Sequence, residues 1–298
     1  MNQVVEAAHA KINLTLNVIR RREDGYHEVE MVMQSLELAD IVRLRQVESG
    51  IRLKTSSAQI PAGKDNLAWR AAQLMFGRFE CTGGLEIQLE KRIPVAAGLA
   101  GGSTDAAAVM RGINRLWGLQ QSTEALCELG ARLGSDVPFC VRGGTALARG
   151  RGELLTGLPD CPPLWLVLVK PPLGVSTAEV YGNLRLDRIG ERPDNEKMIE
   201  ALAEKRPGSI AAALGNVLEE VTVQMVPQVQ GIKQELLRAG AVNAMMSGSG
   251  PTVFAIAEDE NHARTLAKVF EHKEYTVIVT RTINQNSDMH AAHGTTDE

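Results

Sequence analysis

The chain has 298 residues, of which 44% are hydrophobic, and a formal net charge of −4. This length fits one large or two ordinary domains, and the apolar content excludes a wholly disordered chain. The acidic balance argues against a nucleic-acid partner, whose phosphates select basic proteins.

The start of the sequence, its apolar stretches and its cysteines together predict where the protein is located. The start of the chain lacks the pattern of a signal peptide, and no stretch of 18 apolar residues predicts a membrane span. None of the four cysteines belongs to a C-x-x-C pair, which argues against a zinc ribbon and favours a reducing compartment. We expect a cytoplasmic protein without a membrane partner.

The first part of the chain is rich in predicted strands. Polar and apolar residues alternate over 12–18 and 85–89, as in half-buried strands. Further strands are expected at 4–5, 29–38, 41–45 and 51–54. Residues 66–79 have helical spacing.

A glycine-rich turn at 98–102 opens the next part. Helices are predicted at 103–116 and 122–133, the second capped by Ser122, and a strand at 143–148. Glycines and prolines then cluster before residue 164. We place a domain boundary there, giving an N-terminal domain at 1–157 and a C-terminal domain at 158–283.

The C-terminal part mixes both kinds of element, so the fold class is predicted to be α+β. The pattern predicts strands at 164–169, 252–257 and 275–282, with helices at 177–181, 195–205, 209–214, 226–239 and 261–270. Residues 284–298 are polar and are expected to form a disordered tail.

The segment from residue 94 to residue 104 carries the strongest chemical signal. Three glycines and other small residues lead from a strand into a helix, which Ser103 or Thr104 could cap. Such a loop brings backbone N–H groups and the positive helix end close to an anion. It lacks the Walker A pattern, and a plain strand-to-helix turn is the alternative. The predicted ATP-phosphate residues are Pro94, Val95, Ala96, Ala97, Gly98, Leu99, Ala100, Gly101, Gly102, Ser103 and Thr104.

Two charged residues complete a possible phosphotransferase. Lys11 shares one strand face with Asn13, and Asp136 lies between a helix and an apolar segment. Phosphoryl transfer needs a cation and a carboxylate that orients or deprotonates the hydroxyl. Taken singly, Lys11 could belong to a solvated face and Asp136 to a turn. The small residues at 247–252 could line a ligand or form a tight connection.

Together, the ordered motifs resemble those of the GHMP kinases, the superfamily of galactokinase, homoserine kinase and the mevalonate kinases. The resemblance runs from residue 4 to about residue 283. It is carried by A-K-I-N-L at 10–14, R-E-D-G-Y-H at 22–27, A-G-L-A-G-G-S at 97–103, G-S-D-V-P-F at 134–139 and S-G-S-G-P-T at 247–252. The D-G-Y-H motif is similar to that of the members that act on a cytidine diphosphate-linked methylerythritol.

This resemblance implies a fold and a reaction. The fold would be α+β with two domains, the first like a ribosomal-protein domain and the second ferredoxin-like. The enzyme would transfer the γ-phosphoryl group of ATP to the 2-hydroxyl of that methylerythritol substrate, in the non-mevalonate isoprenoid precursor pathway. Lys11 and Asp136 would be the catalytic pair, and Lys11 would hold Asp136 ionised.

The resemblance also assigns the binding residues. Asn13, Tyr26, His27, Thr177 and Tyr181 would bind the substrate, with the two tyrosines as walls around the cytosine. Asn66 and Lys91 would lie near the nucleotide. Mg²⁺ is expected with ATP, held mostly by phosphates and water, because no counterpart of the metal-binding glutamate of mevalonate kinases can be placed.

Three other functions remain open on the sequence. Another GHMP kinase would keep the Lys11–Asp136 pair and lack a pyrimidine site. A nucleotide-binding regulator could retain the fold without catalysis, although both charged residues are present. An RNA-binding protein conflicts with the charge of −4. The sequence does not indicate an oligomeric state.

Overall fold

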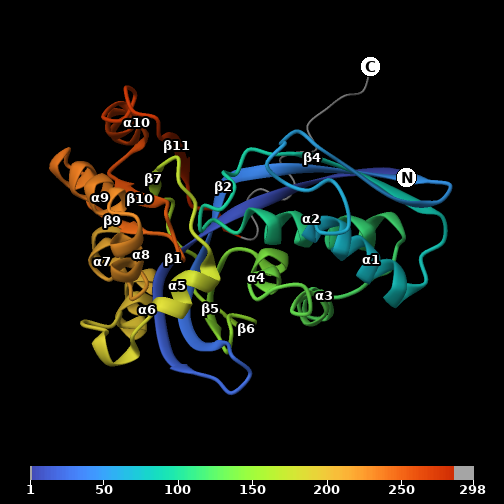
Figure 1. Ribbon diagram of the computed structural model, residues 1–298, viewed down its shortest axis with the longest axis horizontal. Coiled ribbons are helices and arrows are strands. Elements are labelled where there is room, and N and C mark those ends of the chain that lie inside the picture. Colours follow the sequence, from blue (N-terminus) through green and yellow to red (C-terminus); the bar gives the residue numbers. More distant parts are fainter. Residues whose placement is uncertain (1, 285–298) are drawn as a thin grey trace.

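The computed structural model describes residues 2–284 and has an α+β fold with two halves (Figure 1). Within these residues the strands form a seven-stranded and a four-stranded sheet. The larger sheet has the order β3-β4-β2-β1-β8, with β5 also paired to β2 and β6 to β5. Its strands are β1 (Gln3–Arg21), β2 (His27–Val47), β3 (Gly50–Thr55), β4 (Gly84–Glu90), β5 (Thr145–Arg149), β6 (Leu154–Gly157) and β8 (Gly215–Asn216).

The first two strands are longer than predicted. The separate strands expected at 4–5 and 12–18 are one strand, β1, and those at 29–38 and 41–45 are one strand, β2. Buried charges hid this continuity: Glu6 accepts a hydrogen bond from Arg115 at 2.7 Å, and Asp40 is fully buried. Partners that neutralise such groups allow a strand to continue through them.

Four helices pack against the larger sheet and one another: α1 (Leu67–Phe79), α2 (Gly101–Leu116), α3 (Thr123–Gly130) and α4 (Val137–Arg142). The predicted Ser122 cap is confirmed, since its side chain accepts from the N–H of Ala125. The predicted cap of α2 is wrong. The helix begins at Gly101 after a left-handed Ala100 and has no side-chain cap. The short α4 was not predicted because its sequence reads as an apolar segment after a turn.

The smaller sheet has the order β11-β7-β10-β9, with each neighbouring pair antiparallel. In chain order this is 4-1-3-2, the arrangement of a ferredoxin-like βαββαβ unit, as the resemblance implied. Its strands are β7 (Trp165–Lys170), β9 (Asn243–Met246), β10 (Val253–Ala257) and β11 (Thr276–Arg281).

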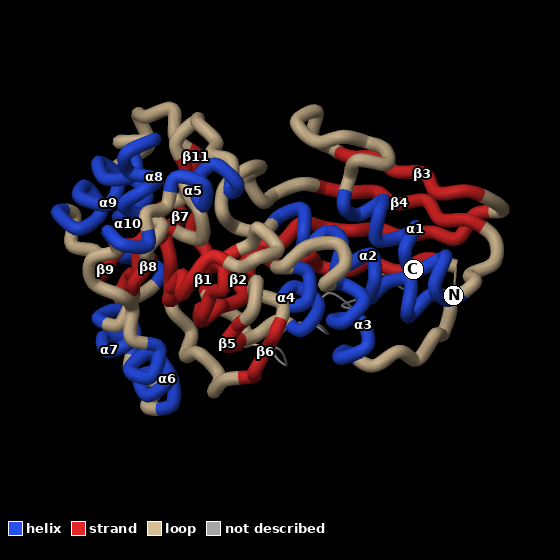
Figure 2. The backbone as a smooth tube through the Cα atoms, turned by 60° about the horizontal axis from the view of Figure 1, so that its bottom comes forward, coloured by secondary structure: helices blue, strands red, loops and turns tan. Residues whose placement is uncertain are grey.

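Helices surround this sheet at the left of Figures 1 and 2. They are α5 (Thr177–Asn183), the 3-10 turn η1 (Leu186–Arg188), α6 (Asn195–Ala203), α7 (Pro207–Ala212), α8 (Glu219–Met225), α9 (Gln228–Arg238) and α10 (Glu260–Lys268). The strand β9 and the helix α8 were not predicted. Both are short, so an apolar period of a strand or a helix repeats in them at most twice and is not recognisable.

The two halves share their cores. Leu16 and Met33 of the long strands pack in one apolar cluster with Val167 and Val169 of β7. The strand β8 crosses between the halves and pairs in parallel with β1. The predicted boundary after residue 157 coincides with the end of β6 and stays a prediction. The predicted tail lies outside the described residues except for Asn284. None of the helices in residues 2–284 has the length and apolar character of a membrane span.

Candidate active site

A cavity of about 1190 Å³ opens where the two halves meet. Lys11, Gly98 and Asp136 line it from the N-terminal half, while Tyr181 and Gly248 line it from the C-terminal half. The sequence motifs that lie far apart along the chain therefore contribute to one site.

Lys11 and Asp136 come together in this cavity. Lys11 is 4% exposed, and its ammonium lies 3.6 Å from Asp136 Oδ2. The Lys11 ammonium also donates to Asn13 Oδ1 at 2.9 Å, and its backbone N–H donates to Leu99 O at 3.2 Å. The ammonium is thus held by the strand β1 and directed at the carboxylate.

The Asp136 side chain remains available for chemistry. Asp136 stands at the start of α4, but its carboxylate makes no capping hydrogen bond. The side chain is 31% exposed, far more than that of its lysine partner. Burial, with a contribution from the charge of Asp136, raises the pKa of the Tyr181 hydroxyl well above its ordinary value. That phenol stays neutral beside the carboxylate.

The glycine loop lies directly against the turn at 247–250. Gly98 has a φ of 73°, and a Cβ there would lie 2.2 Å from the carbonyl oxygen of Ser247. The Ser247 hydroxyl donates to Gly98 O at 3.0 Å. The close approach of two backbones explains why glycine is needed at residue 98.

Most of the predicted phosphate residues line the cavity: Pro94, Val95, Ala96, Ala97, Gly98, Ala100, Gly101, Gly102 and Ser103. Leu99 and Thr104 do not line it, and their predicted phosphate contact stays a prediction. The Leu99 side chain is 1% exposed in an apolar cluster, and the Thr104 hydroxyl donates to Gly101 O at 3.1 Å. Because α2 begins earlier than predicted, Thr104 lies on its first turn and faces inward.

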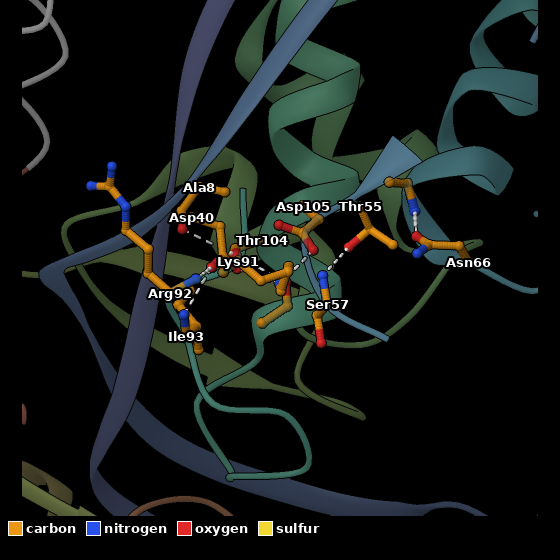
Figure 3. A network of polar contacts seen from close by, with 12 residues as sticks. Ala8, Asp40, Thr55, Ser57, Asn66, Lys91, Arg92, Ile93, Thr104 and Asp105 are labelled. Carbon is orange, nitrogen blue, oxygen red and sulfur yellow. Dashed lines mark hydrogen bonds and ion pairs between the residues drawn. The ribbon is translucent and has the colours of Figure 1, made fainter. Parts of the chain in front are cut away.

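Lys91 lines the cavity but is committed to two buried carboxylates (Figure 3). Its ammonium pairs with Asp40 and lies 2.6 Å from Asp105 Oδ2. Asp40 also accepts from the N–H of Ile93 at 2.8 Å. This cluster ties the end of β4 to α2 beneath the glycine loop. The geometry therefore favours a supporting role for Lys91 over a free nucleotide cation.

Asn66 likewise lines the cavity with its side chain engaged. Its Oδ1 accepts from the N–H of Ala68 at 2.9 Å and caps α1, and its amide donates to Pro61 O at 2.8 Å. The predicted nucleotide contact of Asn66 stays a prediction.

The predicted pyrimidine residues belong to the same cavity. Tyr26, His27, Thr177 and Tyr181 all line the cavity. The His27 and Tyr181 rings are 5.2 Å apart, whereas Tyr26 is 53% exposed and lies 4.9 Å beneath the Arg151 guanidinium. Burial lowers the pKa of His27, with a smaller effect of Arg21, and both favour the neutral ring. The proposed tyrosine sandwich stays a prediction.

Several cavity residues were missed by the sequence reasoning. They include Arg21, Asp105, Ser135, Arg151 and Arg185. The three arginines lie outside the recognised motifs, and only the fold brings them to this cavity. Within residues 2–284 no group of three or more His, Cys, Asp or Glu side chains could hold a metal ion.

Comparisons with known proteins decide the family. Residues 66–144 match the GHMP kinases N terminal domain and residues 198–275 the GHMP kinases C terminal domain. A 4-diphosphocytidyl-2-C-methyl-D-erythritol kinase from Pelotomaculum thermopropionicum is 51% identical over 94% of this chain and 98% of its own. One from Bacillus subtilis is 51% identical over 89% and 91%. The chain belongs to the 4-diphosphocytidyl-2-C-methyl-D-erythritol kinase family of GHMP kinases.

Solved structures agree with this membership. A crystal structure of 4-(cytidine 5'-diphospho)-2C-methyl-D-erythritol kinase matches with a TM-score of 0.80 and 36% identity, over 94% of this chain and 100% of that one. The homoserine kinase of Cytophaga hutchinsonii, at 21% identity and a TM-score of 0.77 over 96% of each chain, shares the fold. The chain is a small-molecule kinase with the two-domain α+β GHMP fold, and ATP use follows from this family.

Proposed function

We propose that this GHMP kinase transfers the γ-phosphoryl group of ATP to the 2-hydroxyl of 4-diphosphocytidyl-2-C-methyl-D-erythritol. The observation that carries the proposal is the Lys11–Asp136 pair, 3.6 Å apart, in a cavity that the glycine loop and the pyrimidine residues also line. The names of the relatives supply the acceptor. This reaction belongs to the non-mevalonate route to isoprenoid precursors.

In the proposed mechanism Asp136 orients the acceptor hydroxyl and accepts its proton as the oxygen attacks the γ-phosphorus. The bond from that phosphorus to the β–γ bridging oxygen breaks, and ADP leaves. Lys11 stabilises the negative charge on Asp136 and on the reacting oxygens. The 16-residue helix α2 begins at Gly101, so its first N–H groups and its positive end favour the ATP phosphates. Asn13 holds the Lys11 ammonium through its amide oxygen.

Mg²⁺ accompanies ATP in this proposal. Among the described residues, Asp105 Oδ1 is buried without a hydrogen-bond partner, and both Asp105 and Ser103 line the cavity. Oxygen donors of this kind suit Mg²⁺, which commonly takes one or two carboxylates and completes its shell with phosphates and water. The bound ion would neutralise charge on the phosphates. The two residues would hold it at the end of the glycine loop.

Two variants separate recognition from chemistry. Tyr26→Ala removes a stacking face, so we expect KM for the cytidyl substrate to rise about 10–100-fold with little change in KM for ATP.

Asp136→Asn keeps the shape of the side chain, so we expect kcat to fall about 10²–10⁴-fold with ATP affinity retained. Steady-state kinetics with both substrates varied gives these values. Equal rises in the KM for ATP and for the cytidyl substrate in Tyr26→Ala would contradict the pyrimidine site. Near-full turnover by Asp136→Asn would show that Asp136 has no part in the mechanism.

A further inference from the structure

We infer that Asn216 is a positioning residue of this active site, which fixes the turn at residues 247–250 against Lys11. We call this segment the C-terminal turn. The inference rests on the proposed function, because it concerns the geometry of the same cavity. Its evidence is a set of contacts outside the sequence motifs, in β8 and α8.

The C-terminal turn reaches the reacting groups. Gly248 and Ser249 line the cavity, and the Ser249 hydroxyl lies 2.9 Å from that of Thr177. A Cβ at Gly248 would lie 3.3 Å from the Lys11 ammonium and 3.5 Å from Asn13 Oδ1. The backbone of the turn therefore forms part of the wall around the catalytic lysine, and its displacement would change the position of that lysine.

Asn216 holds this turn at two points. Its side-chain amide donates to Met246 O at 2.9 Å and to Gly248 O at 2.8 Å. Its Oδ1 accepts from the N–H of Leu218 at 2.9 Å. Both amide hydrogens and the oxygen are thus engaged, and the side chain spans the carbonyl just before the turn and that of Gly248 within it. A planar amide with two donors is suited to this task.

The backbone of Asn216 pairs with β1, the strand that carries Lys11. Gly215 pairs with Thr15 and Asn216 with Leu16, and the N–H of Val217 donates to Leu16 O at 3.0 Å. Lys11 lies on the same strand, β1, five residues before Leu16. Asn216 consequently links the strand that carries Lys11 to the turn that packs on Lys11.

The neighbouring helix supports the rest of the turn. Glu219 Oε2 accepts from the N–H of Met246 at 2.8 Å, and the Thr222 hydroxyl donates to Ser249 O at 3.1 Å. These contacts hold β9 and the far end of the turn. The contact to Gly248, the residue of the turn whose Cβ would lie 3.3 Å from the Lys11 ammonium, comes from Asn216.

The test is Asn216→Asp, which keeps the size of the side chain and the acceptor for Leu218 but removes both donors. We expect kcat to fall about 10–100-fold, because small misplacements of reacting groups have effects of this size. KM for ATP and for the cytidyl substrate should change less than about threefold, since uniform binding is retained.

Asn243→Asp is the matched control. Asn243 lies on β9, and its amide donates to Ala211 O at 2.6 Å while its Oδ1 accepts from the N–H of Ala244 at 2.8 Å. The same substitution there removes a carbonyl contact of the same kind, at α7 instead of the turn. We expect it to lower the melting temperature and to leave kcat within about twofold of wild type, as a purely structural contact does.

A kcat for Asn216→Asp within about twofold of wild type would overturn the inference. An equal loss of kcat in both variants would overturn it as well, because the effect would then be general loosening. If wild type does not use the cytidyl substrate, the proposed function fails and hydrogen exchange decides. The Gly250 amide donates to Ser247 O at 2.9 Å. Its faster exchange in Asn216→Asp than in Asn243→Asp supports the inference, and equal exchange contradicts it.

Discussion

Asp40 and Asp105 share the ammonium of Lys91 inside the protein, so the cluster carries more negative than positive charge. Burial is the main cause that raises the pKa of Asp105 to about 7. Lys91 opposes this shift, and the charge of Asp40 adds to it. A carboxyl group with a raised pKa binds its proton more tightly in the folded than in the unfolded state. The cluster therefore makes the stability of the protein depend on pH.

We expect this group to stabilise the fold at low pH. Its contribution is fully present below the unfolded pKa of about 4 and is lost as pH rises through about 7. Relative to Asp105→Asn, the free energy of unfolding of wild type should fall as pH rises from about 5 to 7. The slope should be on the order of 1 kcal/mol per pH unit, because Asp105 is then protonated in the folded state and ionised in the unfolded state. Urea unfolding at several pH values, with protein free of Mg²⁺ and ATP, measures this.

Asp24→Asn is the control for this measurement. Hydrogen bonding to Arg22 lowers the pKa of the exposed Asp24, so that group does not titrate in the same window. A difference between wild type and Asp105→Asn that stays constant with pH would contradict the account.

Among the elements, the glycine loop and the C-terminal turn depend on backbone contact. Gly98→Ala would place a Cβ 2.2 Å from Ser247 O at a φ of 73°. We expect a loss of about 1–3 kcal/mol in the free energy of unfolding, together with a lower kcat as the loop and turn separate. Gly77→Ala, in the interior of α1 with open space around it, should instead stabilise by up to about 1 kcal/mol. Denaturant unfolding that gave Gly98→Ala the stability of wild type would contradict this packing.

Some elements of the fold could be predicted from the sequence, and others could not. Apolar periodicity predicted α1 and α9, and the ordered motifs predicted the meeting of Lys11 with Asp136. Periodicity could not predict β8, because two residues carry no period, or the continuity of β1 through buried Glu6. Asn216 gave no signal because its function depends on pairing with a strand 200 residues earlier. The resemblance placed Lys91 near the nucleotide, and no sequence pattern indicated that Asp40 and Asp105 would bind its ammonium.

In the whole molecule, the two halves are joined by a shared apolar core and by a strand that crosses between them. The Met33 and Leu16 side chains of the long strands share a core with β7, and β8 completes the larger sheet from the C-terminal half. Domains that share a core unfold together. We expect one cooperative transition, with tryptophan fluorescence and far-UV circular dichroism giving the same midpoint in urea. Two separated midpoints would contradict the shared core.

ADP release from Mg-ATP in the presence of different acceptors identifies the phosphoryl acceptor of this kinase. The assay compares 4-diphosphocytidyl-2-C-methyl-D-erythritol with mevalonate, phosphomevalonate, homoserine and galactose at equal concentrations. We predict release with the cytidyl substrate and background rates with the others. Release with another acceptor in its place would retain the Lys11–Asp136 chemistry and contradict the pyrimidine site. Folded protein that binds ATP and releases no ADP with any acceptor would contradict the kinase assignment itself.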